Sequence, residues 1–208
     1  MVTTTSSQKI TRYSFYERIV HWLAALTFVY SALTGLALWS PKIFWLASVF
    51  GGGEVVRGWH PWGGMIFTVF LALMFLAWAR QMRLDPGDRK WLRGAHRYAR
   101  NDEDGLPEPG KFNAGQKMLF WLQALSTLVL FATGIVLWFP ESMSVGLRLA
   151  SVVTHSLTAV LSVTLIILHV YMGTAAVPGS FSAMLRGRVS PKWAKRHHPK
   201  WHREVSGR

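Results

Sequence analysis

Apolar residues dominate four stretches of the chain, and no Lys, Arg, Asp or Glu interrupts any of them. The stretches cover residues 19–39, 58–79, 118–139 and 149–173. Each one reaches the roughly 20 residues that an α-helix needs to cross a bilayer. The pattern therefore predicts an all-α membrane protein, built as a bundle of four transmembrane helices.

The longest polar segment, residues 80–117, connects the second stretch to the third. Its part over 89–100 is basic and predicts a short helix. Its part over 102–110 combines acidic residues with Pro and Gly, which favours an irregular loop.

A basic tail over residues 177–208 follows the transmembrane domain, which we place at residues 1–176. The tail opens with a Pro-Gly pair. Phe181, Met184 and Leu185 then predict a short amphipathic helix at the membrane surface.

Basic residues are distributed unevenly among the polar segments. The formal net charge is +13, and 20 of the 23 Lys and Arg residues precede the first stretch, follow the fourth, or lie between the second and third. The exceptions are Lys42, Arg57 and Arg148. Because cytoplasmic loops carry the excess of Lys and Arg, both termini and the central loop are predicted to be cytoplasmic. Basic runs beside a membrane favour anionic lipid as their partner and argue against nucleic acid.

Cysteine is absent from the sequence. This excludes disulfides, iron–sulfur ligation by this chain and covalent haem attachment through C-x-x-C-H. The first apolar stretch is longer than the core of a signal peptide, and no clear small-x-small cleavage site follows it. We therefore expect it to be retained as a span.

Four histidines lie within the apolar stretches, at His21, His60, His155 and His169. His155 and His169 are 14 residues apart, which is about 40° short of four full helical turns. Both rings therefore share one face of one helix, about 21 Å apart along its axis. Ionisable residues inside a membrane are costly and usually functional.

The predicted topology pairs these histidines by depth. His21 begins the first span and His169 ends the fourth, so both lie near the inside. His60 and His155 begin the second and fourth spans, so both lie near the outside. Two histidines at one level can bind a haem iron from both faces, which favours electron transfer over oxygen binding. The pattern predicts two such sites.

Other interpretations of these histidines remain open. A zinc site would need two further ligands at each level, and a proton relay would more often include carboxylates within the membrane. Met65, Met74 and Met172 are axial ligands in principle, although Met172 lies one turn from His169 and is interpreted as a packing residue. The other histidines lie among basic residues, where we expect solvated or interface roles: His96, His197, His198 and His202.

Two glycines and one cation are candidates for the haem surroundings. Gly35 lies 14 residues after His21, on the same helix face and at the level of the outer pair, where a porphyrin needs a neighbour without a side chain. Close helix packing explains Gly35 equally well, and Gly134 allows the same two interpretations. Arg57 lies one turn before His60 and is a candidate partner for a haem propionate, or an interface anchor.

Five segments carry a resemblance to a known family. They are RYSFYERIVHW (12–22), FGGGEVVRGWHPWGG (50–64), KFNAGQKMLFW (111–121), LHVYMG (168–173) and GRVSPKWAKRHHPKWHREV (187–205). Along nearly its whole length the chain resembles the cytochrome b (gamma) subunit of respiratory formate dehydrogenase. The alternative is the cytochrome b subunit of a membrane-bound nickel–iron hydrogenase or of another periplasmic oxidoreductase, which also has four helices and haem histidines.

The resemblance implies a di-haem cytochrome b. It assigns His21 and His169 to the inner haem b and His60 and His155 to the outer one, which is the pairing that topology gives. Electrons would arrive from an iron–sulfur (beta) subunit at the outer face. They would pass through the outer and then the inner haem to menaquinone or ubiquinone.

The segment NAGQK resembles the family's quinone site. It makes Asn113, Gly115 and Gln116 candidate quinone-binding residues, with His169 close by. Asn and Gln side chains can hydrogen-bond a quinone carbonyl. Capping of a helix N-terminus is an equally good interpretation of Asn113.

Formate chemistry is not visible in this chain. The resemblance implies that oxidation belongs to an alpha subunit with a molybdenum or tungsten pterin cofactor. It also implies a multi-pass protein of the bacterial inner membrane. The segment GTAAVPGS (173–180) departs from the family pattern, which leaves the tail's contact with a partner subunit open. A haem-free membrane anchor or assembly factor is the interpretation from another class.

Overall fold

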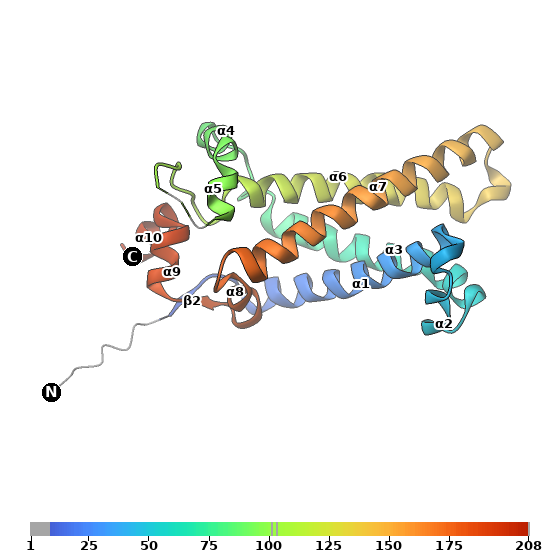
Figure 1. Cartoon of the computed structure of the whole chain (residues 1–208), viewed down its shortest axis with the longest axis horizontal. Coiled ribbons are helices and arrows are strands. Elements are labelled where there is room, and N and C mark those ends of the chain that lie inside the picture. The colour runs from blue at the N-terminus through green and yellow to red at the C-terminus, as the bar shows by residue number, and fades with distance from the viewer. Residues whose placement is uncertain (1–8, 101, 103, 208) are drawn as a thin grey trace. The chain divides into compact units, whose positions relative to one another are not determined.

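The computed structural model describes residues 9–100, 102 and 104–207, most of which are helical. In chain order the elements are β1 (Ile10–Thr11), α1 (Phe15–Trp39), η1 (Pro41–Ile43), α2 (Leu46–Val49), α3 (Gly53–Trp78), α4 (Pro86–Arg93), α5 (Ala95–Ala99), α6 (Ala114–Trp138), η2 (Pro140–Ser142), α7 (Val145–Tyr171), η3 (Met172–Ala176), α8 (Ser180–Arg186), β2 (Arg188–Val189), α9 (Pro191–His197) and α10 (Pro199–Ser206). Helices α1, α3, α6 and α7 are long and apolar enough to cross a membrane (Figure 1). The predicted helical fold with four such helices is confirmed.

Each long helix begins four or five residues before its apolar stretch. At the start of α1, the Glu17 backbone N–H donates to Ser14 Oγ at 3.2 Å, and the Ser14 N–H donates to the Glu17 carboxylate at 2.7 Å. Asn113 and Gln116 form the same reciprocal pair at the start of α6. These side chains satisfy backbone donors that the first helical turn leaves without partners. The helices therefore start at their polar caps rather than at the edge of the apolar pattern.

The chain forms two compact units. The bundle unit comprises Ile19–Ala77 and Leu122–Ile166, and the loop–tail unit comprises Met1–Arg18, Trp78–Trp121 and Ile167–Arg208.

Within the bundle unit, several buried side chains are polar, and two of them bind each other. Gln123 on α6 donates from Nε2 to Ser162 Oγ on α7 at 2.7 Å, and both side chains are buried.

Between α1 and α3, a Cβ atom at Gly63 would lie 2.5 Å from the Tyr30 ring, so glycine lets this ring pack against the neighbouring helix. Many Leu, Val and Ile side chains on the outside are exposed, as expected of a surface that faces lipid.

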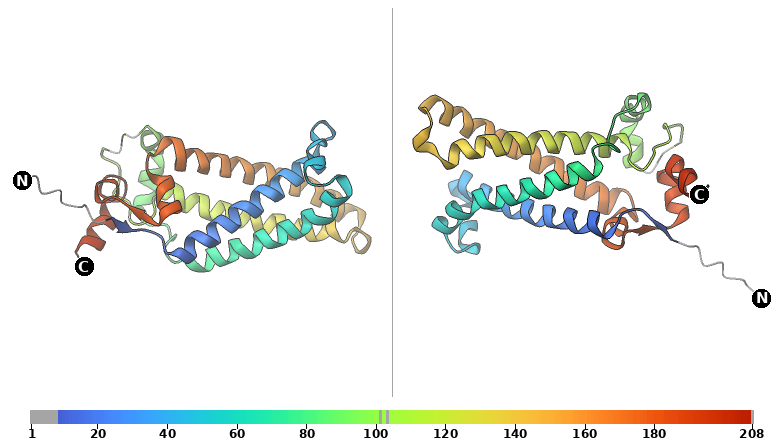
Figure 2. Two further views of the ribbon diagram at one scale, coloured as in Figure 1. Left: turned by 90° about the horizontal axis from the view of Figure 1, so that it is seen from below. Right: turned by 180° about the vertical axis from the view of Figure 1, so that it is seen from behind.

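In the loop–tail unit, β1 and β2 pair antiparallel, with Ile10 opposite Val189 and Thr11 opposite Arg188 (Figure 2). The basic helix predicted over 89–100 is two helices, α4 and α5, which meet at Gly94. Leu106 packs there, and a Cβ atom at position 94 would lie 2.2 Å from its side chain. The described part of the segment 102–110 is irregular, as predicted.

A buried ion pair joins α4 to the start of α6. Lys117 Nζ lies 2.9 Å from Asp88 Oδ2 and 3.0 Å from Asp85 Oδ2. Lys117 and Asp88 are both buried, whereas Asp85 is exposed and caps α4. The hydrogen bond from Lys117 lowers the pKa of Asp85. Charged residues predicted for a polar loop therefore hold two helices of the loop–tail unit together.

The expected solvated or interface role is wrong for His197 and His198, because both side chains are buried, and His198 is buried completely. His198 Nδ1 lies 2.8 Å from the Gly110 carbonyl, to which it donates, and Nε2 accepts from Arg12 Nη2 at 3.0 Å. Burial, and then the neighbouring Arg12 guanidinium, hold the pKa of His198 well below its usual value of 6.5. The burial of His198 could not be predicted from the basic segment around it, because its ring bonds to Arg12 and Gly110, which are far away in the sequence.

Candidate functional site

Two of the four membrane histidines face each other inside the bundle unit. The ring centroids of His60 on α3 and His155 on α7 lie 6.4 Å apart, with an angle of 74° between the ring planes. Both side chains are partly buried. The structure thus brings together the two histidines that depth along the spans assigned to the outer level.

A threonine on the neighbouring helix fixes the orientation of the His60 ring. Thr34 Oγ1 donates its proton to the Tyr30 carbonyl at 2.7 Å and lies 2.9 Å from His60 Nδ1. Because the hydroxyl proton is already used, the oxygen accepts from Nδ1–H. This tautomer leaves Nε2 of His60 with a lone pair that can bind a metal.

The same arrangement holds His155. Thr133 Oγ1 on α6 donates to the Val129 carbonyl at 2.7 Å and lies 2.9 Å from His155 Nδ1. The same argument leaves Nε2 of His155 available. Both rings are therefore fixed in the form that metal-binding histidines adopt when their second nitrogen is hydrogen-bonded.

A glycine follows each of these threonines and makes room for the histidine ring. A Cβ atom at Gly35 would lie 3.1 Å from His60 Cε1, which is too close without a shift of the ring. A Cβ atom at Gly134 would lie 3.6 Å from His155 Cε1, an ordinary contact. The two candidate glycines thus adjoin the outer histidines themselves.

The remaining candidates around the histidines are more dispersed. Arg57 lies in α3 with an exposed side chain. His21 is partly buried in α1 in the bundle unit, and His169 is exposed near the end of α7 in the loop–tail unit. The pairing of His21 with His169 stays a prediction.

Asn113 and Gln116 cap α6 and lie close together in the loop–tail unit. Gln116 N–H donates to Asn113 Oδ1 at 2.9 Å, and Asn113 N–H donates to Gln116 Oε1 at 3.0 Å. Capping, the alternative interpretation of Asn113, is therefore confirmed. Since the two amide oxygens are engaged, each side chain presents its NH₂ group as a donor. Gly115 lies against the Trp91 ring, 3.3 Å from the position of an added Cβ atom.

Comparison with known proteins identifies the family. Residues 12–187 match the family described as prokaryotic cytochrome b561. The nitrate-inducible formate dehydrogenase cytochrome b556 subunit of Escherichia coli K12 is 33% identical over 202 residues, which cover 96% of this chain and 93% of that protein.

This chain belongs to the prokaryotic cytochrome b561 family. The formate dehydrogenase cytochrome b556 subunit of Haemophilus influenzae is 34% identical over 200 residues, covering 94% of this chain and 83% of that protein. A second formate dehydrogenase cytochrome b556 subunit of Escherichia coli K12 is 32% identical over 200 residues. The resemblance to formate dehydrogenase cytochrome b subunits, inferred from five sequence segments, is confirmed.

The donor set of this cytochrome b561 family member fits a haem. Among the residues that the structure describes, no group of three His, Cys, Asp or Glu side chains is placed to hold a metal ion. Two histidines can complete the coordination of an iron whose other ligands come from a porphyrin. An imidazole–metal bond is about 2 Å long, so two such bonds plus the offset of each ring centre from its nitrogen give roughly 6 Å between centroids. The observed 6.4 Å agrees with that separation.

Sequence reasoning missed Thr34 and Thr133. Each is a hydroxyl residue directly before a glycine within an apolar stretch, in the pairs Thr34-Gly35 and Thr133-Gly134. This repeated Thr-Gly pair could have indicated two equivalent positions on the first and third apolar stretches. It gives no indication of which histidine the hydroxyl contacts, because His60 is 26 residues from Thr34 and His155 is 22 from Thr133.

Proposed function

We propose that this chain is the membrane cytochrome b subunit of a formate dehydrogenase complex, which passes electrons from an iron–sulfur subunit to a membrane quinone. The observation that carries the proposal is the outer histidine pair, with ring centroids 6.4 Å apart and both Nδ1 atoms hydrogen-bonded to threonine. The names of the relatives in Escherichia coli and Haemophilus influenzae give the proposal its enzyme complex.

His60 and His155 would hold one haem b through their Nε2 atoms, and His21 and His169 would hold a second. Bound there, each haem would supply a one-electron carrier between the iron–sulfur subunit and the quinone. Helix α7 would contribute one ligand to each site, because His155 and His169 lie on one face of it, about 21 Å apart. Gly35 and Gly134 would leave room beside the outer ligands.

The direction of transfer follows from the proposed topology. The basic residues before α1, between α3 and α6 and after α7 support a cytoplasmic position for both termini in the bacterial inner membrane. Electrons that move inward oppose a membrane potential that is negative inside, by about 2.3 kcal/mol per 100 mV for a full crossing. The potential difference between the electron donor and the quinone must supply this energy.

Asn113 and Gln116 would bind the quinone at the start of α6. Their amide NH₂ groups can donate to a quinone carbonyl while their oxygens cap the helix. His169 would contribute from the end of α7. Gly115 would act by letting Trp91 pack beside the cap, since that ring occupies the space where a side chain would lie.

Replacing the side-chain amide of Asn113 or Gln116 with a carboxylate tests the quinone site and keeps the oxygen atoms that cap α6. Asn113→Asp keeps the oxygen that accepts from the Gln116 N–H but loses the NH₂ donor, and Gln116→Glu does the same on its partner. We expect each variant to raise the KM for quinone at least tenfold in the complex and to retain its haem content. Asn113→Ala is the comparison, because it loses the cap as well, at about 1 kcal/mol.

An unchanged KM for quinone in both exchange variants would remove Asn113 and Gln116 from the quinone site. That result would leave the proposed haem ligands untouched, because the haem spectrum reports on them separately.

A further inference from the structure

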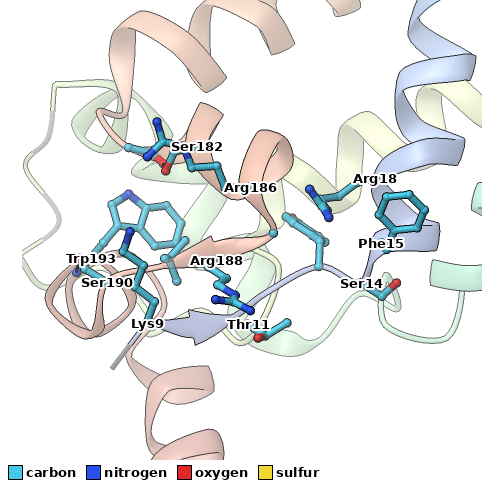
Figure 3. A pocket seen from close by; sticks show the side chains of 14 residues that line it. Lys9, Thr11, Ser14, Phe15, Arg18, Ser182, Arg186, Arg188, Ser190 and Trp193 are labelled. Atoms are coloured by element: carbon cyan, nitrogen blue, oxygen red, sulfur yellow. Dashed lines mark hydrogen bonds between the residues drawn. The ribbon is translucent and has the colours of Figure 1, made fainter. Parts of the chain in front are cut away.

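A pocket of about 580 Å³ lies in the loop–tail unit, between the β1–β2 pair, the start of α1 and helix α8. Four basic side chains surround it, from four parts of the chain: Lys9, Arg18, Arg186 and Arg188 (Figure 3). Among the described residues that line the pocket there is no Asp or Glu. The four positive charges therefore repel one another across the pocket unless an anion occupies it.

Arg18 shows that part of this site is already built. Its Nη1 donates to the Leu185 carbonyl at 2.8 Å, which fixes the guanidinium at the pocket. Its Nε is buried and has no hydrogen-bond partner within the described residues. A buried N–H without an acceptor destabilises the folded protein. Among the described residues that line the pocket, no acidic side chain neutralises the charge of Arg18.

Gly187 makes the close approach of Arg18 possible. Its φ of 77° lies in the left-handed region, and a Cβ atom there would lie 2.8 Å from the Tyr13 carbonyl and 3.1 Å from Arg18 Nε. The chain therefore turns tightly between α8 and β2. That turn connects Arg186 and Arg188, which both line the pocket.

Exposed apolar side chains lie at and beside the pocket. Phe15, the first residue of the membrane-length helix α1, lines the pocket and is 71% exposed. Phe181 and Leu185 on α8 are also exposed. Aromatic and basic side chains at the end of a membrane helix are typical of the lipid headgroup region. A soluble anion would bind to the basic side chains alone. A lipid would also contact the exposed apolar side chains.

We propose that this pocket binds the headgroup of an anionic phospholipid. Arg18, Arg186 and Arg188 would hold the phosphate, because guanidinium groups bind phosphate oxygens in a fixed, paired geometry. The exposed apolar side chains of α1 and α8 would lie against the acyl chains. The proposal does not depend on haem or quinone.

Native mass spectrometry of the delipidated full-length chain, titrated with phosphatidylglycerol or phosphatidylcholine, tests the site. We expect one phosphatidylglycerol to be retained preferentially over phosphatidylcholine. The double variant Arg186→Gln/Arg188→Gln should weaken that affinity at least tenfold. Both side chains are exposed, so their loss spares the core. Arg89→Gln/Arg93→Gln is the matched control, since it removes the same charge from exposed positions of α4 outside the pocket.

Equal phosphatidylglycerol affinity in both double variants would overturn the proposal. So would inorganic phosphate that displaces the lipid at similar concentration, because the site would then be one for a soluble anion. On the wild-type chain, photo-crosslinking by a phosphatidylglycerol with a reactive headgroup should label peptides within residues 9–18 and 179–193. Labelling confined to other peptides would contradict the assignment.

Discussion

Thr34 and Thr133 fix the tautomer of His60 and His155. Each hydroxyl donates its proton to a carbonyl one turn earlier in its own helix. Its oxygen therefore accepts a hydrogen bond from the histidine on the adjacent helix. A hydrogen bond of this kind makes the other ring nitrogen more basic. A more basic ligand stabilises ferric over ferrous iron and lowers the reduction potential.

Thr133→Val should therefore raise the midpoint potential of the haem that we propose at His60 and His155, because valine has a similar shape and lacks the acceptor oxygen. The potential of the inner haem should stay unchanged. Thr133→Ser keeps the hydroxyl and should keep the wild-type potential. A redox titration of the haem absorbance measures all three, with Thr34→Val as a second test on His60. If neither valine variant moved the outer potential, the threonines would have no role in tuning the ligand.

His198 is neutral in the folded protein although it lies in a strongly basic segment. Its Nε2 accepts from Arg12, whose positive charge disfavours protonation of the ring. The low pKa of His198 has a direct consequence for stability. The unfolded chain takes up a proton as the pH falls through about 6.5, and the folded chain does not.

The contribution of His198 to the free energy of unfolding should thus be constant above about pH 6.5. Below that pH the free energy of unfolding should decrease, by up to about 1.4 kcal/mol for each pH unit. Thermal unfolding of the detergent-solubilised protein between pH 8 and pH 5 measures the slope. His198→Gln should flatten it, whereas His202→Gln, on a partly buried residue of α10, should not. Identical slopes in the wild type and in His198→Gln would show that this proton is not linked to folding.

At the scale of the elements, the loop between α3 and α6 is held by charge as well as by apolar contact. Lys117 pairs with Asp88 where both side chains are 8% exposed, and Trp91, Tyr98 and Ala114 form a buried cluster nearby in sequence. A buried charge that loses its partner costs far more than an exposed one.

Lys117→Met should destabilise the docking of α4 on α6 by about 3–5 kcal/mol, because Asp88 would remain buried without a counter-ion. Limited proteolysis within residues 80–113 should become correspondingly faster. Lys117→Met/Asp88→Asn removes both charges and should recover much of the resistance. A single variant as resistant as the wild type would mean that the pair contributes nothing to docking.

The four long helices were predictable, because an uninterrupted apolar stretch that crosses a membrane must satisfy its own backbone hydrogen bonds and therefore forms a helix. Of the shorter elements, α4, α5 and α8 correspond to predicted helical segments, and the others were not predicted. The proximity of His60 and His155 was predictable from their matching depth along the spans. The starts of the helices were not, because Ser14 and Asn113 act through hydrogen bonds before the apolar pattern begins. The contact between Arg12 and His198 could not be predicted either, because these residues are 186 positions apart in the sequence.

At the scale of the whole molecule, the two units carry different chemistry. The bundle unit contains His21 and the outer histidine pair, and the loop–tail unit contains His169, the Asn113–Gln116 cap and the basic pocket. Helix α7 has residues in both, and its two histidines make it a shared element of the two proposed haem sites. We therefore expect one chain of 208 residues to hold two haems.

The haem content of the purified chain, measured by absorbance in the reduced and oxidised states, tests this claim most directly. The wild type should show b-type bands with two haems per chain. His155→Ala should lose the outer haem and His169→Ala the inner one, so that each variant retains one. A colourless wild-type protein, or two variants that both retain two haems, would contradict the account.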